Sequence, residues 1–343
     1  MSIRGRVRHV GGVLARHGWL GPNTGVVQRV ARALDRHLAR GAGGPASVAC
    51  RWNGLASDAF TRDLERYSWT GLPSVHANHN YLISGDRDIY WVDWVRDHYF
   101  PDGHAGDVLS LGCGSGHLDR IFRQRGLVMR SLTGLDISPA AVGRAQTLAE
   151  EASLAPTIRY QAADLNRFTL PSRAFDFVYF FQSLHHIEAL EHVLDGVRAA
   201  LRPGGLLLVN EFVGPSRFQW TDDQRRVATE ALATLPRDLR KDLRTGLTKT
   251  AIHRPTLAKM VAADPSEAVR SAEIETELRS RFEVIGEWSW GGTINHLVFQ
   301  DIAGNFEPLN ESHLSHVERL IQFENTAIRE GRLPSDFKVF MLR

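Results

Sequence analysis

Short apolar runs alternate with helix-length amphipathic segments through the middle of the chain. Runs with strand character cover 108–111, 158–161, 175–180 and 205–209, and a further strand ends at residue 136. A short apolar run between turn residues is typical of a buried strand, whereas apolar positions three or four apart are typical of a helix face. Strands separated by helix-length crossovers predict a parallel sheet with helices on both faces and right-handed connections.

The chain beyond this region predicts a return to the same sheet. We expect a sixth strand at 282–286 and a last strand at 337–341, with helices near 296–306 and 312–329 between them. The stretch 215–280 is far longer than the dozen or so residues that a sheet crossover needs. Its mostly helical pattern predicts a cap over the substrate site.

Two polar clusters in this cap are interpreted as helix starts. Thr221 and Gln224 have the spacing of a capping box, in which the two side chains cap each other's backbone N–H groups. Asp264, Pro265 and Glu267 fit the N-cap, first and third positions of another helix. We therefore assign no chemical role to either cluster.

These patterns predict an α/β fold: a doubly wound (Rossmann-like), seven-stranded, mostly parallel sheet with a helical N-terminal lid and a helical cap inserted after strand five. The N-terminal part of the chain, within residues 1–45, is rich in arginine and is called the basic arm. It has apolar positions at helical spacing over 26–39, which suits either an amphipathic helix docked on the body or a contact with a partner or an anionic surface. The aromatic residues of the lid are typical of core packing, and as a group they suit a cover over a flat ligand. The expected segments are the basic arm and linker at 1–45, the aromatic-rich lid at 46–104, the core at 105–214, the cap at 215–280 and the C-terminal part of the core at 281–343.

The composition of the chain limits the partners, metal sites and cellular location that we expect. The chain of 343 residues has 41 Lys and Arg against 39 Asp and Glu, a balance that argues against a surface built to hold nucleic acid. Its two cysteines, Cys50 and Cys113, form no CxxC pair, so we predict neither a disulfide framework nor a cysteine-rich zinc site, and we assign no metal ligands. No apolar stretch is long enough to span a bilayer, and the N-terminus lacks the apolar run of a secretory signal. We therefore expect a reducing, cytoplasmic location.

Glycines at 112, 114 and 116 follow the first strand of the core and precede a helix. Alternate glycines at such a turn let the backbone bend tightly and approach a ligand. Asp136 ends the next strand, about 20 residues later, where a carboxylate can accept hydrogen bonds from both hydroxyls of a ribose. A dinucleotide site requires GxGxxG, but here the third glycine comes one residue early, with His117 after Gly116. The pattern therefore predicts a nucleotide site of another kind.

The glycine loop resembles motif I of the class I S-adenosylmethionine (SAM)-dependent methyltransferases. Further segments resemble motifs of that family in the same order: DLN at 164–166, FDFVYFFQSLHHI at 175–187 and LRPGG at 201–205. The resemblance covers about residues 105–213. One position departs from it, because the family commonly has an acid where this chain has Ser110. This departure affects only a secondary contact to the methionine end of the cofactor.

The resemblance implies SAM as the cofactor and assigns its contacts to residues of this chain. Since SAM carries its own leaving group, the protein mainly has to align a nucleophile with the methyl group. The residues so assigned are Gly112, Cys113, Gly114, Ser115 and Gly116 for the methionine moiety, Asp136 for the ribose, Ile137, Asp164 and Leu165 for the adenine, and Gln182 beside the sulfonium.

Polar residues at the ends of the fourth and fifth strands are the candidates for handling the methyl acceptor. His185 and His186 follow strand four and Glu211 follows strand five, at the carboxyl edge where open α/β sheets bind ligands. An imidazole can deprotonate a hydroxyl or orient an amine near neutral pH, and Glu211 is a second candidate base. Structural alternatives are a helix start for His185 and a hydrogen-bond anchor for Glu211. The residues expected to contact the substrate come next: Phe218, Gln219 and Trp220.

The predicted function is methyl transfer to an oxygen, with nitrogen as the alternative, on a polar small molecule, natural product or sugar. The layout of lid, core and cap resembles bacterial small-molecule or sugar methyltransferases. Balanced charge argues against a nucleic-acid substrate, and the lack of an NPPY-like motif after strand four argues against methylation of an amino group on a nucleobase or glutamine. Two alternatives come from other classes: a catalytically silent SAM-binding scaffold or regulatory protein, and an NAD-linked oxidoreductase that would use the same Asp136.

Overall fold

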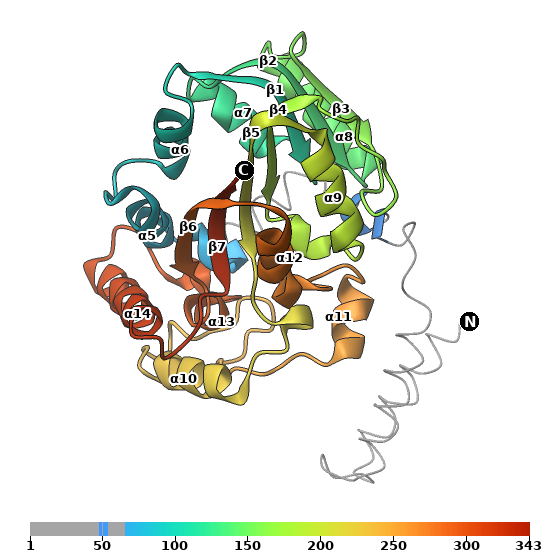
Figure 1. Cartoon of the computed structure of the whole chain (residues 1–343). Coiled ribbons are helices and arrows are strands. Elements are labelled where there is room, and N and C mark those ends of the chain that lie inside the picture. The colour runs from blue at the N-terminus through green and yellow to red at the C-terminus, as the bar shows by residue number, and fades with distance from the viewer. Residues whose placement is uncertain (1–47, 50, 54–65) are drawn as a thin grey trace.

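A seven-stranded sheet with the order β3-β2-β1-β4-β5-β7-β6 forms the centre of the computed structural model, which describes residues 48–49, 51–53 and 66–343 (Figure 1). Strands β1 to β5 pair in parallel, and β7 is antiparallel to both β5 and β6. The predicted doubly wound, mostly parallel sheet is confirmed, whereas the basic arm lies outside the described residues. The strands are β1 (His104–Leu111), β2 (Val128–Asp136), β3 (Ile158–Ala162), β4 (Phe175–Phe181), β5 (Leu201–Phe212), β6 (Val284–Gly291) and β7 (Phe337–Leu342).

The sheet is buried on both faces because its central strands are apolar at consecutive positions. In β4, Phe177 and Tyr179 pack into one layer of helices, and Val178 and Phe180 pack into the other. Such continuous apolar runs are what a parallel sheet covered on both sides requires. The first layer includes α6 and α7, and the second includes α9 and α12. The α-helices among the described residues 66–343 include α5 (Pro73–Ser84), α6 (Trp91–Tyr99), α7 (His117–Gln124), α8 (Pro139–Glu151), α9 (Leu190–Ala200), α10 (Asp222–Ala233), α11 (Leu257–Ala263), α12 (Ile274–Arg281), α13 (Asn295–Phe299) and α14 (Glu311–Arg329).

Several elements differ in length from their predictions. Strand β5 extends from 201 to 212 rather than 205 to 209. It begins earlier because Leu201 pairs with Phe175 of β4, and it ends later because β7 pairs with its second half. The antiparallel pairing with β7 likewise carries β6 on to Gly291. The helix expected near 296–306 is divided into α13 and a separate short turn at 303–305. The longer β5 matters most, because Asn210 and Glu211 become part of a buried strand.

The cap helices α10 and α11 lie beyond the carboxyl ends of the parallel strands, together with α13 from the C-terminal part of the core (Figure 1). Helix α10 begins with the predicted capping box of Thr221 and Gln224. The prediction of a helix that begins at Asp264 is wrong, because this residue follows the end of α11 and residues 265–270 form turns and bends. The Asp264 carboxylate accepts from both the backbone N–H and the hydroxyl of Ser266, a local pairing that competes with helix formation.

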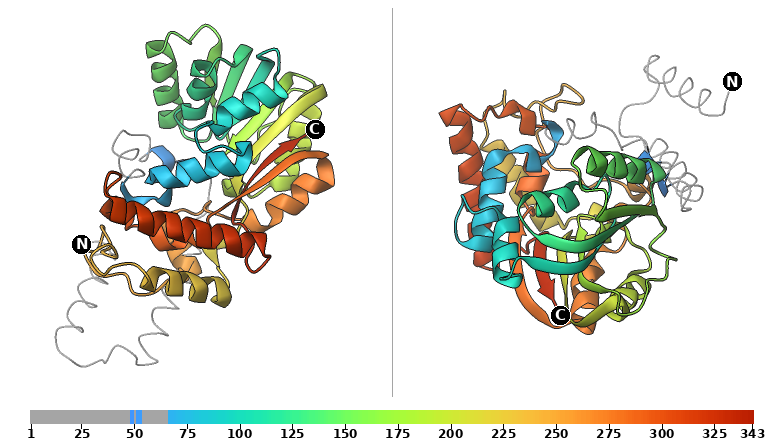
Figure 2. Two further views of the ribbon diagram at one scale, coloured as in Figure 1. Left: turned by 90° about the vertical axis from the view of Figure 1, so that its left-hand side faces the viewer. Right: turned by 90° about the horizontal axis from the view of Figure 1, so that it is seen from above.

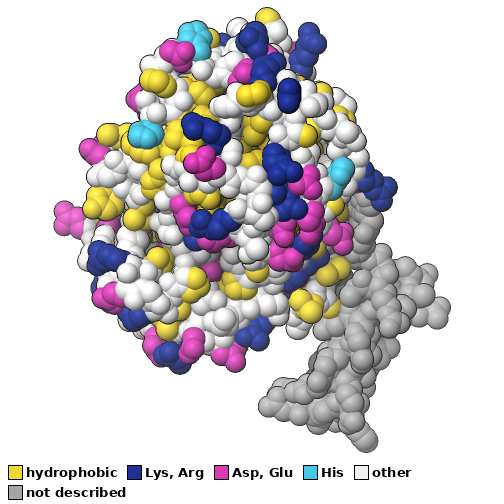
Figure 3. Space-filling view, in the orientation of Figure 1, with side chains coloured by type: hydrophobic (Ala, Val, Ile, Leu, Met, Phe, Trp, Pro, Cys, Tyr) yellow, Lys and Arg dark blue, Asp and Glu magenta, His cyan; other side chains and the backbone are white. Residues whose placement is uncertain are grey.

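The lid helix α5 lies beside α14, at the opposite end of the described chain (Figure 2). Asn78 and Asn325 exchange amide hydrogen bonds between these helices, and Arg87 forms an ion pair with Glu318 of α14. Acidic and basic side chains are interspersed over the face that Figure 3 shows, in line with the balanced composition. Within the described residues, none of the helices combines the length and the apolar character that crossing a bilayer needs.

A buried carboxyl group at the junction of cap and sheet makes stability depend on pH. Asp336 is 1% exposed, and burial raises its pKa to about 7, helped by nearby Glu324. Because this pKa is higher in the folded protein than in the unfolded chain, the free energy of unfolding falls as pH rises from about 4 to about 7. Asp336→Asn keeps an acceptor for the Gln224 amide and removes the charge.

We therefore expect Asp336→Asn to raise the free energy of unfolding by about 2 kcal/mol at pH 8 and to leave it nearly unchanged at pH 4. Urea denaturation at the two pH values measures this difference. Asp238→Asn, at an exposed position, is the matched control. An equal effect of Asp336→Asn at both pH values would show that the carboxyl group is not protonated in the folded protein.

Candidate functional site

The loop between β1 and α7 turns through three glycines with left-handed backbone: Gly112, Gly114 and Gly116 have φ of 64°, 52° and 70°. A Cβ at Gly112 would lie 2.4 Å from that of Ser183, and one at Gly116 would lie 2.2 Å from the Tyr160 hydroxyl. A Cβ at Gly114 would meet nothing within 4 Å. The outer glycines are thus required by their neighbours, and the middle one leaves open space where a ligand can approach the backbone.

Asp136 lies at the end of β2, directly beside this loop. Its Oδ2 accepts from the Gly114 N–H (2.9 Å) and its Oδ1 from the Ser138 N–H (2.8 Å). Burial raises the pKa of the Asp136 carboxyl group, and the two backbone N–H groups oppose that shift. A carboxylate has about four lone-pair positions, so each oxygen can accept one further hydrogen bond, as a ribose would need. Half-buried Ile137 follows it in the chain.

The residues assigned to the adenine and sulfonium ends lie on the turns after β3 and β4. Asp164 Oδ1 accepts from the backbone and side-chain amides of Asn166, at 3.1 Å each, and neighbouring Leu165 is buried. Gln182 has a φ of 53°, and its side-chain amide donates to the backbone and side-chain oxygens of Asn210 on β5, at 3.2 Å each. These turns are therefore held in place by hydrogen bonds within the protein.

Glu211 and His185 meet between β4 and β5, as a buried pair. Glu211 is 0% exposed; its Oε2 accepts from the Ser183 and Leu184 N–H groups, and its Oε1 contacts His185 Nδ1 and accepts from the Phe212 N–H. Burial alone would lower the pKa of His185, but Glu211 and Glu267 together raise it to about 10. Glu211 thus holds both the turn after β4 and the imidazole.

The second histidine of the pair contacts the cap. His186 Nδ1 lies 3.0 Å from Ser266 Oγ, which donates to Asp264 Oδ1 at 2.6 Å. Burial, with His185 as a second cause, lowers the pKa of His186. On the other side, Glu267 Oε1 lies 3.4 Å from His185 Nε2, and the two histidines lower the pKa of this glutamate to about 2 against the effect of burial. The cap turn therefore completes a polar cluster at the carboxyl edge of β4.

The middle of the chain is similar to known methyltransferases. Residues 109–209 match a family model described as a methyltransferase domain. A sterol 24-C-methyltransferase of Gibberella zeae is 30% identical over 185 residues, which are 53% of this chain and 46% of that protein. The 27-O-demethylrifamycin SV methyltransferase of Amycolatopsis mediterranei is 29% identical over 225 residues, 65% of this chain and 70% of that protein. This chain contains a class I SAM-dependent methyltransferase domain.

A solved structure also resembles this chain. A SAM-dependent methyltransferase from Mesorhizobium loti has a TM-score of 0.40 and 19% identity, over 74% of this chain and 97% of that one. Similarity at this level carries no argument about the site. The chain also spans only about half the length of the sterol methyltransferase that it matches, so that protein's substrate does not transfer to it.

SAM is the cofactor of this methyltransferase domain, as predicted, and the NAD-linked alternative is thereby removed. The residues present fit it: the backbone at Gly114 faces open space and the Asp136 carboxylate has unused lone pairs beside it. When bound, SAM supplies a methyl group on a sulfonium, which is a good leaving group. The individual cofactor contacts assigned to Cys113, Ser115, Ile137, Asp164, Leu165 and Gln182 remain predictions.

Three residues near the methyltransferase site were missed in the sequence. Asp119 on α7 accepts from the Ser110 hydroxyl (2.8 Å), so a carboxylate lies beside the position where the family commonly has an acid. Glu267 was interpreted as a capping residue, yet it reaches His185. Trp52 lies edge-on to His186, with ring centroids 4.9 Å apart. No local pattern indicated these contacts, because each joins residues from different elements.

The three predicted substrate residues follow β5. Phe218 stacks on Trp220, with centroids 5.3 Å apart and planes 3° apart, and it has a left-handed φ of 52°. The Gln219 amide donates to the backbone carbonyls of Arg217 and Pro255. The amide is thus engaged within the cap, and the aromatic pair packs into the hydrophobic core, where Trp220 is 8% exposed. Their contact with a substrate remains a proposal.

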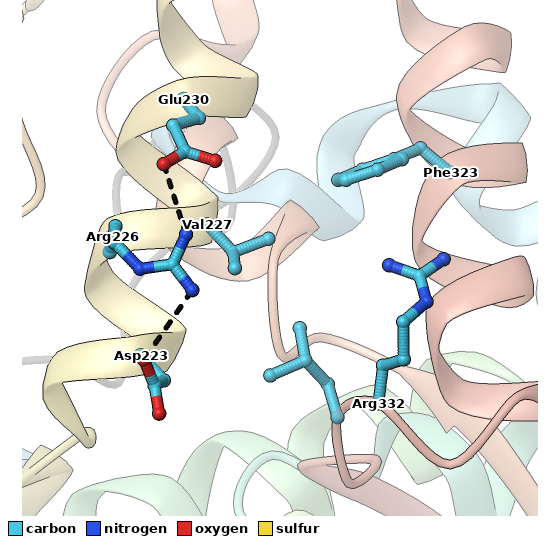
Figure 4. Close-up of a pocket in the computed structure, with 7 residues that line it drawn as sticks. Asp223, Arg226, Val227, Glu230, Phe323 and Arg332 are labelled. Atoms are coloured by element: carbon cyan, nitrogen blue, oxygen red, sulfur yellow. Dashed lines mark hydrogen bonds and ion pairs between the residues drawn. The ribbon is translucent and has the colours of Figure 1, made fainter.

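A separate surface pocket lies between α10 and the end of α14 (Figure 4). Arg226 on α10 pairs there with Asp223 and Glu230, one turn to either side. The pocket belongs neither to the glycine loop nor to the ends of β4 and β5, so we assign it no role. Its lining residues are Asp223, Arg226, Val227, Glu230, Phe323, Arg332 and Leu333.

Proposed function

We propose that this protein transfers the methyl group of SAM to an oxygen of a polar small molecule, natural product or sugar. The observation that carries the proposal is the cluster of His185, His186 and Glu267 at the carboxyl edge of β4, next to the glycine loop. A hydroxyl acceptor must lose its proton during methyl transfer, and this cluster offers groups that can promote that loss.

We propose that one polar side chain of this region contacts the acceptor and that the others hold that side chain in position. Glu211 has two donors at each oxygen and no exposure, so we assign it a positioning role rather than that of a base. His185 is held between Glu211 and Glu267 and shares that role. His186 is half-buried, and its Nδ1 lies 3.0 Å from Ser266 Oγ, so we assign its Nε2 to the acceptor. We therefore propose His186 as the residue of the pair that serves the acceptor.

The names of two relatives indicate different acceptor atoms, oxygen in one and carbon in the other. One relative, by its name, methylates 27-O-demethylrifamycin SV, which supports transfer to oxygen. Another is named a sterol 24-C-methyltransferase, which makes carbon the second candidate. The charged cluster favours oxygen, because carboxylates and imidazoles suit the loss of a hydroxyl proton. The lid at 46–104 and the cap at 215–280 are proposed to enclose the acceptor.

Labelled SAM tests the proposal directly. The full chain is incubated with methyl-labelled SAM and a small-molecule extract of the source cells, and the labelled product is isolated. We expect label on a hydroxyl oxygen of a polar metabolite, together with release of S-adenosylhomocysteine. Label on carbon would support the second candidate and contradict ours. SAM binding without any release of S-adenosylhomocysteine would instead support a silent scaffold.

A further inference from the structure

We propose that His185, His186 and Glu267 bind a divalent transition-metal ion, of the Zn²⁺ type, at the carboxyl edge of β4. One ligand atom of each residue lies within 4.8 Å of those of the other two. Two imidazoles and one carboxylate form the protein ligand set of many zinc and non-haem iron sites. We predicted no metal ligands from the sequence, so this site is a new assignment; Glu267 is about 80 residues from the histidines along the chain and had the spacing of a helix cap.

The separations in this cluster suit a shared ion. His185 Nε2 and Glu267 Oε1 are 3.4 Å apart. Two ligands bound at zinc distances in tetrahedral geometry are separated by roughly 3.4 Å. This pair already has the spacing that an ion would set, and the ligand atom of the half-buried His186 ring lies within 4.8 Å of both partners.

Both imidazoles are also oriented as metal ligands are. His185 contacts Glu211 through Nδ1, and His186 contacts Ser266 through Nδ1 at 3.0 Å. Ser266 is itself fixed, because it donates to Asp264 at 2.6 Å. Metal-binding histidines almost always donate their other ring N–H to an oxygen acceptor of this kind, which fixes the tautomer and the ring. We assign both Nε2 atoms to the ion, which would replace the contact between His185 Nε2 and Glu267 Oε1 and displace the proton on that nitrogen.

The charge around the cluster favours a cation. Glu211, Asp264 and Glu267 bring three carboxyl groups to the two imidazoles. The nearby Arg217 guanidinium donates to the backbone carbonyl of Glu267, at 3.1 Å. His186 and Glu267 are the half-buried members of the cluster, so the acceptor would approach a bound ion from their side. His186 would then promote proton loss by holding the ion, not by taking the proton itself.

Cobalt titration of the full chain, freed of metal by a chelator, tests this site without SAM or any acceptor. We expect one Co²⁺ per chain, with visible absorption bands that Zn²⁺ abolishes by competition. Glu211→Gln should weaken Co²⁺ binding about 10–100-fold, since it loosens the hold on His185. Glu267→Gln and His186→Ala remove a ligand and should weaken binding at least as much. Exposed His192→Ala and Glu230→Gln are the matched controls and should bind Co²⁺ normally.

The proposal is overturned if the wild-type chain binds no Co²⁺ saturably, or if Glu267→Gln and His186→Ala both bind it as the controls do. SAM affinity, measured by calorimetry on each variant, shows whether the fold is intact. Glu267→Gln preserves the size of the side chain, so it carries the test if His186→Ala fails to fold. Because the titration needs neither SAM nor acceptor, its outcome is independent of the proposed methyl transfer.

Discussion

His186→Ala is expected to lower kcat for methyl transfer by more than a hundredfold while changing SAM affinity less than threefold. The imidazole lies at the carboxyl edge of β4, held by Ser266 on the cap and by the edge of the Trp52 ring. Promotion of proton loss from an acceptor is typically worth about 10²–10⁴ in rate. The glycine loop and Asp136 are other elements, so cofactor binding should survive the change.

Release of S-adenosylhomocysteine with the acceptor found by labelling measures kcat, and calorimetry measures SAM affinity. His192→Ala is the control, because this histidine is exposed on the following helix, where its Nε2 lies 3.2 Å from the backbone carbonyl of Phe168. A His186→Ala enzyme with kcat within fivefold of wild type would show that proton loss needs no help from this residue. Catalysis would then rest on alignment of the acceptor alone.

Asp136→Ala is expected to weaken SAM binding by about 1–3 kcal/mol. The substitution removes the charged acceptor that the ribose hydroxyls would use. It also leaves the N–H groups of Gly114 and Ser138 without the carboxylate that now orders them, so the glycine loop loses part of its preorganisation. Both effects act on cofactor affinity, which titration calorimetry measures directly.

Ser138→Ala is the matched control for this substitution. The Ser138 hydroxyl accepts from the Ala141 N–H at the start of α8, so its loss costs about 1 kcal/mol of stability without touching the carboxylate. We expect SAM affinity within threefold of wild type in this variant. Unchanged SAM affinity in Asp136→Ala would remove the ribose assignment, and equal losses in both variants would indicate damage to α8 instead.

The local sequence pattern was sufficient to predict the elements that form the core of the domain. The glycine loop, the end of β2 at Asp136 and the cap of α8 by Ser138 all follow from residues that are close in sequence. Backbone conformation at a glycine turn and at a helix start depends on neighbouring residues, so such signals are visible in the chain itself. The same reasoning correctly predicted the capping box of Thr221 and Gln224.

The sequence pattern predicted the wrong structure where residues with the spacing of a helix cap instead contact a residue far away in the chain. Asp264, Pro265 and Glu267 have capping spacing, but Ala268 takes a left-handed φ of 48° and no helix forms. The turn instead places Glu267 against His185. Asp119 lies beside Ser110 for a similar reason, since α7 packs back onto β1.

The sequence by itself therefore determined the fold class, the cofactor loop and the candidate histidines of this protein. Only the tertiary structure decided which acids those histidines meet. Glu211 faces His185 because β5 is longer than its apolar run, and Glu267 arrives through the cap turn. The physical reason is that hydrogen bonding within a turn depends on adjacent residues, whereas pairing across elements depends on how the whole chain packs.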